Sequence, residues 1–396
     1  MNITCTVNLA TFLFFALSLV VKSGYGYGAA LLLILAIIIL AREQKNLRAR
    51  RDLHAIALLL LLAALFGAFD AWRSHLLLRD YELPGKYLLV PVILYALAIR
   101  PPDARAIWLG AATGALLGAT SAWYYSQYTP ELLAMGRGAR YLHPIQFGNI
   151  AAVLAVLSAC GLREVKGLPV RLYLGAGIAA GLYAMLLSET RGSLLALLLL
   201  GIILLWQGRR HVNGRFWLAT LAAFAMLWWA GGETLSRRFA DIRNDLVHYQ
   251  QGHSATSIGA RLELWQFALQ EGARHPLLGA GTAGFRHDKT AWLHDHPARE
   301  FIGELGHVHN EYLDAFARRG ATGLALVLAL IIVPLVAYRR LPPSAARTAG
   351  IAHLVLYGGF GLTQTALFGH NSGMLFFALP LCLLYSAACR PREKAA

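Results

Sequence analysis

The sequence has little charge for its length and few cysteines. Only 14% of its 396 residues are charged, whereas 57% are hydrophobic and the mean hydropathy is +0.51. Because apolar runs long enough to cross a bilayer of about 30 Å recur along the chain, we expect a membrane protein. The four cysteines, Cys5, Cys160, Cys382 and Cys389, all lie in or beside apolar segments, so we expect neither an extracytoplasmic disulfide nor a cysteine-based metal site.

Two motifs of metal-dependent enzymes are also missing. The chain has no H-E-x-x-H motif and no D-x-D motif of the kind that holds a divalent metal on a nucleotide-sugar. Histidines are crowded between 287 and 309, but no cysteine or carboxylate pattern accompanies them; they are His287, His294, His296, His307 and His309. We therefore expect no metal ion and no other cofactor in the reaction.

Acidic residues are fewer than basic ones. Lys and Arg total 36 and Asp and Glu 21, which gives a formal net charge of +15. In a soluble protein such an excess would suggest a polyanionic partner, but cytoplasmic loops of membrane proteins are enriched in Lys and Arg. We therefore assign the excess to topology and expect membrane lipids, and no nucleic acid, as partners. The short basic connections are 41–51, 100–105, 163–171, 208–215, 339–347 and the tail 390–396.

The apolar segments predict an all-α polytopic membrane protein with about twelve transmembrane helices. The candidate spans are 7–21, 28–41, 53–70, 86–99, 106–125, 145–162, 171–187, 193–207, 215–231, 321–338, 348–367 and 371–389. Since alternate connections are basic, both termini are expected in the cytoplasm.

One outward connection is long. Between Gly231 and Gly320 the charges are nearly balanced, and helical patterns and glycine turns alternate, which predicts a folded, mainly helical periplasmic insert. We expect three regions: 1–230 with the spans up to the insert, 231–320 as the insert with the catalytic motifs, and 321–396 with the last spans and a cytoplasmic tail.

The segment 183–200, YAMLLSETRGSLLALLLL, places Glu189 and Arg191 in a short break between two apolar runs. A helix that begins near Gly192 would point its N-terminus outward, and its free N–H groups and positive dipole end favour an anion. A guanidinium is a planar fork suited to phosphate oxygens. Ser188, Glu189 and Arg191 are therefore candidate substrate-binding residues. The alternative is that Glu189 and Arg191 neutralise each other, or that Arg191 reaches the lipid headgroups.

A second candidate lies in the insert. Residues 259–273 show helical periodicity, with Arg261 beside the apolar face. That face would consist of Ile258, Leu262, Trp265 and Leu269. Glycines 279, 281 and 284 match G-x-G-x-x-G, but a dinucleotide site needs a strand before the motif. Because a helix and His275-Pro276 precede these glycines, we interpret them as a turn.

A third helical pattern, 304–320, places His309, Leu313 and Phe316 on one face and ends at Gly320. This helix would lead into the span 321–338 and hold His309 near the membrane surface. The pKa of histidine suits proton transfer near neutral pH. A structural role for a lone histidine on such a face is the alternative.

A fourth outward segment, RGARYLHPIQFGN at 137–149, carries Arg137, Arg140 and His143 beside Gln146 and Asn149. It either lines a polar cavity or anchors the headgroup region, and the residues themselves leave both interpretations open.

Taken in order along the chain, these segments resemble the O-antigen ligase and polymerase superfamily. The resemblance consists of S-x-x-R-G at 188–192, R-x-x-x-W at 261–265, HPLLGAG at 275–281 and HN-x-x-L at 309–313, on a topology with a long outward loop between late spans. Within the superfamily the chain is most similar to the O-antigen ligases of lipopolysaccharide assembly. The topology covers most of the chain, whereas the specific motifs are confined to these four segments.

The resemblance implies a GT-C-like protein of the Gram-negative inner membrane that catalyses metal-independent, inverting glycosyl transfer on the periplasmic face. The implied donor is O-antigen polysaccharide on undecaprenyl diphosphate, and the implied acceptor is a sugar hydroxyl of lipid A core. Arg191 and Arg261 would bind the diphosphate and His309 would activate the acceptor. The further substrate-binding candidates are Arg137, Arg140, His143, Ser188, Glu189, Trp265 and Asn310.

The motifs leave the acceptor open. A polymerase of the same superfamily would use a lipid-linked glycan as acceptor, and a third kind of enzyme would transfer the glycan to a protein. A transporter of polyprenyl-linked glycans is the alternative from another class. Transporters commonly show internal repeats and broken helices near the bilayer midplane, and neither is clear in this sequence.

Overall fold

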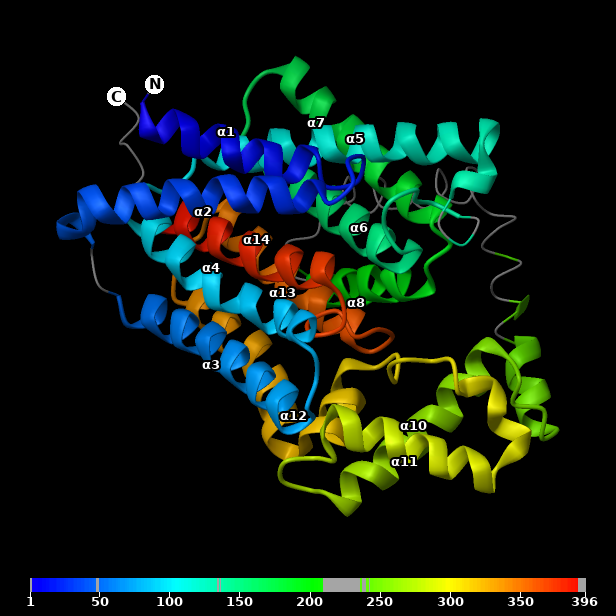
Figure 1. The fold of residues 1–396 in the computed structure, drawn as a ribbon. Helices are drawn as coiled ribbons and strands as arrows, with labels where there is room; N and C mark the ends of the chain where they lie inside the picture. Colours follow the sequence, from blue (N-terminus) through cyan, green and yellow to red (C-terminus); the bar gives the residue numbers. More distant parts are fainter. Residues whose placement is uncertain are drawn as a thin grey trace.

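The computed structural model describes residues 2–47, 50–133, 135, 137–208, 236, 240–241 and 243–390. All regular secondary structure in these residues is helical (Figure 1). The predicted span 215–231 and the beginning of the insert lie outside the described residues.

Each of the other predicted spans overlaps one apolar helix. These helices are α1 (Ile3–Ala16), α2 (Gly24–Glu43), α3 (Arg51–Arg73), α4 (Glu82–Ile99), α5 (Ala104–Tyr128), α6 (Pro144–Gly161), α7 (Leu168–Leu187), α8 (Arg191–Gly208), α12 (Glu311–Arg339), α13 (Ala345–Gly361) and α14 (Asn371–Cys389). Short 3₁₀ helices lie at Gln44–Asn46, Leu78–Tyr81, Pro130–Leu132 and Pro297–Ile302.

In the described part of the chain, seven helices are long and apolar enough to cross a membrane, namely α2, α3, α4, α6, α7, α12 and α14. Helix α1 and residues 191–205 of α8 are apolar but shorter. These helices support the prediction of a polytopic membrane protein. The number twelve and the GT-C-like comparison remain predictions.

Small residues let the helices α1 and α5 approach closely. Gly110, Gly114 and Gly118 of α5 follow one another at intervals of four residues, so they lie on one helix face. A Cβ atom on Gly114 would lie 2.2 Å from the carbonyl oxygen of Phe15 in α1, so only glycine fits there. Contacts between small residues of this kind are a common way to pack helices in membranes.

The span predicted at 348–367 is wrong at its end. Helix α13 ends at Gly361, and residues 362–370 form a connection to α14. This connection contains the polar residues Thr363, Gln364 and Thr365 between two apolar helices. Side chains of two other helices fix its position by hydrogen bonds. The amide of Leu367 donates to Oε2 of Glu311 over 2.6 Å, and the hydroxyl of Tyr87 donates to the Leu367 carbonyl over 2.8 Å.

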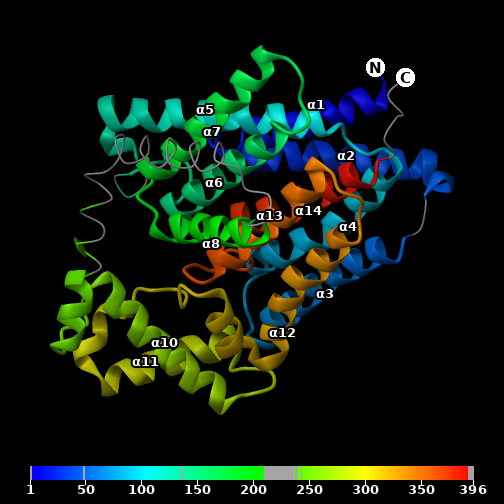
Figure 2. The ribbon, with the colours of Figure 1, turned by 180° about the vertical axis from the view of Figure 1, so that it is seen from behind.

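The insert packs beside the membrane helices as a separate group of helices, shown in green and yellow in Figures 1 and 2. It consists of α10 (Ser257–Arg274), α11 (Gly281–Asp295) and the 3₁₀ helix Pro297–Ile302, which pack against the first part of α12. Its own hydrophobic core is formed by Leu264, Phe267, Ala268, Phe285, Ile302, Val308 and Ala317. The division of the chain at 230 and 320 remains a prediction.

The predicted buried face of α10 is wrong. Leu269 is 51% exposed, whereas Leu264, Phe267 and Ala268 are buried. Both sets have helical spacing, and the sequence pattern of α10 alone does not distinguish them. Packing against α11 determines which face of α10 is buried: the ring centroid of Phe285 in α11 lies 5.4 Å from that of Phe267.

The helix predicted over 304–320 begins later than expected. Helix α12 starts at Glu311 with Asn310 as its N-cap, so His309 lies in the preceding loop and not on a helix face. Gly320 adopts φ 65° and ψ −162°, which interrupts the helix where the sequence predicted its end. Residues 321–339 then continue in a new direction as a membrane helix.

The turn at Gly279 yields a stability prediction. Gly279 has φ +65°, and a Cβ atom there would lie 2.3 Å from the Arg318 carbonyl carbon. We expect Gly279→Ala to destabilise the protein by more than the about 1–2 kcal/mol that left-handed backbone costs a non-glycine residue. Thermal denaturation in detergent would measure the change. Gly306→Ala is the matched control, because open space surrounds its Cβ position; equal melting temperatures for the two variants would contradict the prediction.

Candidate active site

A pocket of about 230 Å³ lies at the N-terminus of α8. It contains three arginines, Arg137, Arg191 and Arg261, which come from three segments far apart in the sequence. The full lining is Arg137, Ile145, Glu189, Thr190, Arg191, Gly192, Ser257, Arg261 and Thr363. We call these residues the arginine pocket. Three guanidinium groups at a helix N-terminus form a site for an anion.

The turn between α7 and α8 holds the N-terminus of α8 in place. Ser188 is fully buried, and its hydroxyl donates to the Met185 carbonyl over 2.6 Å. The hydroxyl of Thr190 donates to the Pro144 carbonyl over 3.2 Å, and Glu189 adopts φ +53°. Ser188 therefore shapes the turn and lies outside the arginine pocket, although the sequence predicted it as a substrate-binding residue. Glu189 and Arg191 line the pocket, and their roles towards a substrate remain predictions.

Arg191 is oriented by two carboxylates that the sequence analysis did not identify. Its Nη2 donates to Oδ2 of Asp241 over 3.1 Å, and its Nη1 lies 3.9 Å from Oδ2 of Asp245. Both acids belong to the insert, outside every motif considered above. The sequence signal for them was weak, because acidic residues are common in the balanced charge pattern of this region.

Arg261 reaches the same pocket from α10. Burial lowers the pKa of its guanidinium, and the nearby charges of Arg191 and Arg137 lower it further, whereas Asp245 raises it. Among the described residues Arg261 has neither a hydrogen bond nor an ion pair. Since an arginine stays protonated in proteins, Arg261 is held near the like charges of Arg191 and Arg137, and an anion in the pocket would offset this repulsion.

Four histidines gather next to this pocket. Their ring centroids are 4.1 Å apart for His307 and His309, 5.8 Å for His307 and His370, and 5.9 Å for His143 and His370. Gln364 joins them, with its Nε2 3.2 Å from Nε2 of His370. We call His143, His307, His309 and His370 the histidine cluster. The sequence analysis noticed three of the four but had no reason to connect them with His370, which a different loop supplies.

His309 has three unusual features. Its backbone adopts φ +54°, a left-handed conformation that is uncommon for a residue other than glycine. Its Nδ1 is buried and has no hydrogen-bond partner among the described residues. Burial lowers the pKa of His309 to about 3, and the positive charges of His307 and Arg261 contribute, while a hydrogen bond with Gln364 opposes the shift. At neutral pH the imidazole is therefore uncharged and able to accept a proton.

Trp265 and Asn310 hold the loop that carries His309. The indole Nε1 of Trp265 donates to the Val308 carbonyl over 3.1 Å. Asn310 caps α12, because its Oδ1 accepts from the amides of Tyr312 and Leu313 over 3.0 and 3.1 Å. Both residues were predicted to bind substrate, and the structure indicates that they position His309.

The remaining predicted residues divide between the site and its surroundings. Arg137 lines the arginine pocket, and His143 caps α6 and belongs to the histidine cluster. Arg140 lies outside the pocket lining: it is exposed, donates to the hydroxyl of Tyr125 and packs 4.9 Å from the Tyr141 ring centroid. Of the two interpretations of this loop, the structure favours a polar cavity for Arg137 and an anchoring role for Arg140.

The arginine pocket and the histidine cluster are adjacent. Thr363 lines the pocket, and the next residue, Gln364, contacts the histidines. The charge of Arg261 acts on both His307 and His309. A substrate anion in the pocket would therefore lie within electrostatic reach of an uncharged base.

The histidine cluster predicts acid sensitivity. Burial lowers the pKa of all four histidines, to about 3 for His309 and about 4 for His370. The unfolded chain takes up these protons near pH 6.5, whereas the folded chain does so only at lower pH. Stability is therefore complete above about pH 6.5 and falls as the pH drops towards 4, by at least about 1 kcal/mol at pH 5.

Melting temperatures at pH 7.5, 6 and 5 would measure this loss of stability. His370→Gln should weaken the pH dependence, while His294→Ala, which removes a histidine with a 92% exposed side chain, should not. A wild-type melting temperature that stays constant across this range would contradict the assignment.

These observations describe a polytopic, helical membrane protein with a pocket lined by three arginines next to a cluster of buried histidines. Residues 176–328 match the family described as O-Antigen ligase. The match supports, over this part of the chain, the superfamily that the sequence motifs predicted. The matched residues include Arg191, Arg261 and His309 and exclude the loop of Arg137.

The chain is also similar to an uncharacterized protein of Haemophilus influenzae. The two are 24% identical over 409 residues, which cover 97% of this chain and 98% of the relative. The similarity therefore extends over the membrane helices on both sides of the matched family region. The relative's name assigns it no activity. The comparison therefore shows how much of the chain is shared, but it indicates no reaction.

Proposed function

We propose that this protein is an O-antigen ligase, which transfers O-antigen polysaccharide from undecaprenyl diphosphate to a sugar hydroxyl of lipid A core on the periplasmic face of the inner membrane. The observation that carries the proposal is the convergence of Arg137, Arg191 and Arg261 in one pocket at the N-terminus of α8. At about 230 Å³ the pocket is smaller than the about 300–1,000 Å³ of sites for drug-sized ligands. Its size suits a diphosphate, with the glycan and the lipid extending out of it.

The donor's leaving group is a lipid diphosphate. As the bond between the sugar C1 and the phosphate oxygen breaks, negative charge develops on that oxygen. Arg191 and Arg261, together with the amides at the start of α8, would stabilise this charge. Asp241 and Asp245 hold the Arg191 guanidinium in place before substrate arrives. The arginines thus supply positive charge that other transferases obtain from a metal.

His309 is the proposed general base. It would take the proton of the acceptor hydroxyl as the hydroxyl oxygen bonds to the sugar C1 from the face opposite the diphosphate. This displacement inverts the anomeric centre, and the diphosphate leaves with the bonding electrons. Charge is conserved in this step, because His309 gains one positive charge with the proton and the leaving diphosphate gains one negative charge.

Donor binding would make His309 a stronger base. In the free protein burial lowers the pKa of His309 to about 3, and the positive charges of His307 and Arg261 contribute to this shift. A bound diphosphate would offset these charges, although not the burial, so the pKa of His309 would rise. The base would thereby become effective when the donor is in place.

The experiment is complementation of a strain that lacks its own O-antigen ligase, with the matching lipid A core supplied. Gel electrophoresis and mass spectrometry would follow the glycan on lipid A core and on undecaprenyl diphosphate. Transfer to lipid A core that is lost in Arg191→Ala, Arg261→Ala and His309→Ala supports the ligase. Longer lipid-linked chains with bare core would identify a polymerase instead. Glycan attached to protein would indicate the third kind of transferase, and no change in any pool with well-expressed protein would favour a transporter.

A further inference from the structure

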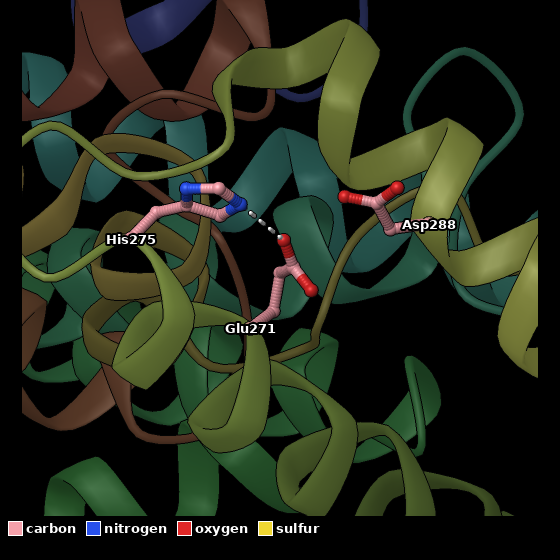
Figure 3. Close-up of side chains that lie close together, drawn as sticks. All are labelled: Glu271, His275 and Asp288. Atoms are coloured by element: carbon pink, nitrogen blue, oxygen red, sulfur yellow. Dashed lines mark ion pairs between the residues drawn. The ribbon is translucent and has the colours of Figure 1, made fainter.

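A second cluster of chemical groups lies in the insert, away from the arginine pocket. It consists of Glu271 and His275 at the end of α10 and Asp288 on α11, shown in Figure 3. One ligand atom from each residue lies within 4.8 Å of the other two. Glu271 is ten residues from Arg261 on the same helix, so the cluster is about 15 Å from the arginine along the helix axis. It takes no part in the proposed transfer.

Glu271 is the residue that indicates a ligand. Its side chain is fully buried, and its Oε1 has no hydrogen-bond partner among the described residues. A buried carboxylate oxygen that accepts no hydrogen bond is costly. This oxygen faces the imidazole of His275, whose Nε2 lies 3.5 Å away, and Asp288 approaches from the other helix (Figure 3). Three groups thus point into a common space, although their contacts with one another are long.

The spacing fits a bridging ion. Two ligands, each about 2.1 Å from a tetrahedrally coordinated zinc ion, lie about 3.4 Å apart. The Nε2 of His275 and the Oε1 of Glu271 are separated by 3.5 Å, close to this distance. Asp288 is partly exposed and has room to turn its carboxylate inward. An imidazole with two carboxylates also matches the ligand types that zinc binds.

Neighbouring side chains orient the ligand atoms. Arg274 lies 3.4 Å from the second oxygen of Glu271, which leaves Oε1 for the ion. His287 contacts Oδ1 of Asp288 over 2.9 Å and directs this carboxylate from outside. Partners of this kind orient the ligands of established metal sites and increase their affinity.

We propose that Glu271, His275 and Asp288 bind one divalent transition-metal ion, for which zinc has the best-matched chemistry, and that this ion links α10 to α11. Water would complete the coordination. Both linked helices contribute side chains to the core of the insert, and α10 carries Arg261, which lines the arginine pocket. The site is thus structural, and it is separate from the glycan transfer proposed above.

This site was not foreseen from the sequence, where no metal was expected. Glu271 and His275 lie one turn apart on a helix, so their proximity is readable from the spacing. Asp288 follows a turn and a second helix, and only the packing of α11 on α10 brings it to the other two. The histidines that crowd the sequence after 286 supply none of the ligands.

The test uses the full chain, purified in detergent without a polyhistidine tag and treated with a chelator. Zinc is then added in equilibrium dialysis, and bound metal is measured by mass spectrometry. We expect one bound zinc per chain, and an affinity at least about 10-fold weaker in Asp288→Asn and in His275→Ala. Zinc should also raise the melting temperature of the wild type but not that of Asp288→Asn.

Controls make the result specific. His294→Ala removes an exposed histidine that lies beside a carboxylate on the same helix, and it should bind zinc like the wild type. Asp288 is partly exposed, so Asp288→Asn tests the site even if the buried variant Glu271→Gln fails to fold. The absence of saturable zinc binding, or equal binding by wild type, Asp288→Asn and His275→Ala, would overturn the proposal. Because the readout is bound metal, this result is independent of whether the chain transfers glycan.

Discussion

Replacing Arg261 with alanine is expected to reduce glycan transfer by about 10²–10³-fold, the usual effect of removing one preorganised group that stabilises charge in a transition state. Arg261 is partly buried, and among the described residues it has no hydrogen bond or ion pair of its own. It faces Arg137 and Arg191 across a small pocket. An arginine held against like charges has a clear use only when an anion binds. The measurement is the rate of transfer by purified protein at saturating acceptor.

Two variants separate charge from geometry. Arg261→Lys keeps the positive charge but loses the planar fork, so its activity should fall between those of the wild type and Arg261→Ala. Arg243→Ala removes an exposed arginine of the insert that lies outside the pocket lining, and it should retain full activity. Wild-type rates in Arg261→Ala, from protein with an unchanged melting temperature, would remove Arg261 from the mechanism.

Replacing His309 with alanine is expected to reduce transfer by about 10²–10⁴-fold, the range for a general acid or base. Because donor affinity resides in the arginine pocket, the loss should appear in kcat more than in the donor KM. The wild-type rate should also fall on the acid side, where His309 becomes protonated. If a bound donor raises the pKa of His309 as proposed, this fall should lie at higher pH in kcat than in kcat/KM. Steady-state kinetics between pH 4 and 8 would show the fall in kcat, whereas kcat/KM should stay nearly constant over this range, because the pKa of His309 in the free protein is about 3.

A positioning role for His309 would give different results. If His309 accepts a proton, added imidazole should partly restore transfer by His309→Ala, and the remaining activity of this variant should lack the acid-side fall. His253→Ala, an exposed histidine of the insert, is the control and should behave like the wild type. Full activity in His309→Ala would exclude it as the base. Lost activity with an unchanged pH profile and no rescue would indicate that it only orients other groups.

The connection between α13 and α14 shows where the sequence pattern was misleading. Thr363 and Gln364 stand in a run that is apolar enough to be predicted as part of a span. The chain leaves the helix at Gly361, and the connection is fastened by Glu311 and Tyr87. A polar pair at the end of an apolar run was the available signal. A hydropathy average over a long window hides this polar pair. The hydrogen bonds that hold the connection come from helices far away in the sequence.

The sequence by itself determined the helices and the chemical types at the site. Long apolar runs form helices in a membrane because their backbone groups must be paired internally, and this local requirement is readable without a fold. Charge near a membrane segment is costly. For this reason the sequence alone singled out Arg191, Arg261 and His309.

Only the tertiary structure decided which of these residues meet. Arg137, Arg191 and Arg261 converge because the loop before α6, the start of α8 and the first turns of α10 line one pocket. His370 joins His309 through a loop that sequence spacing does not relate to it. The same packing buries Ser188 and brings Asp288 close to Glu271. It also places Trp265 and Asn310 where they position the loop of His309. Contacts between segments far apart in the chain depend on how all the helices pack together, and no local pattern records that arrangement.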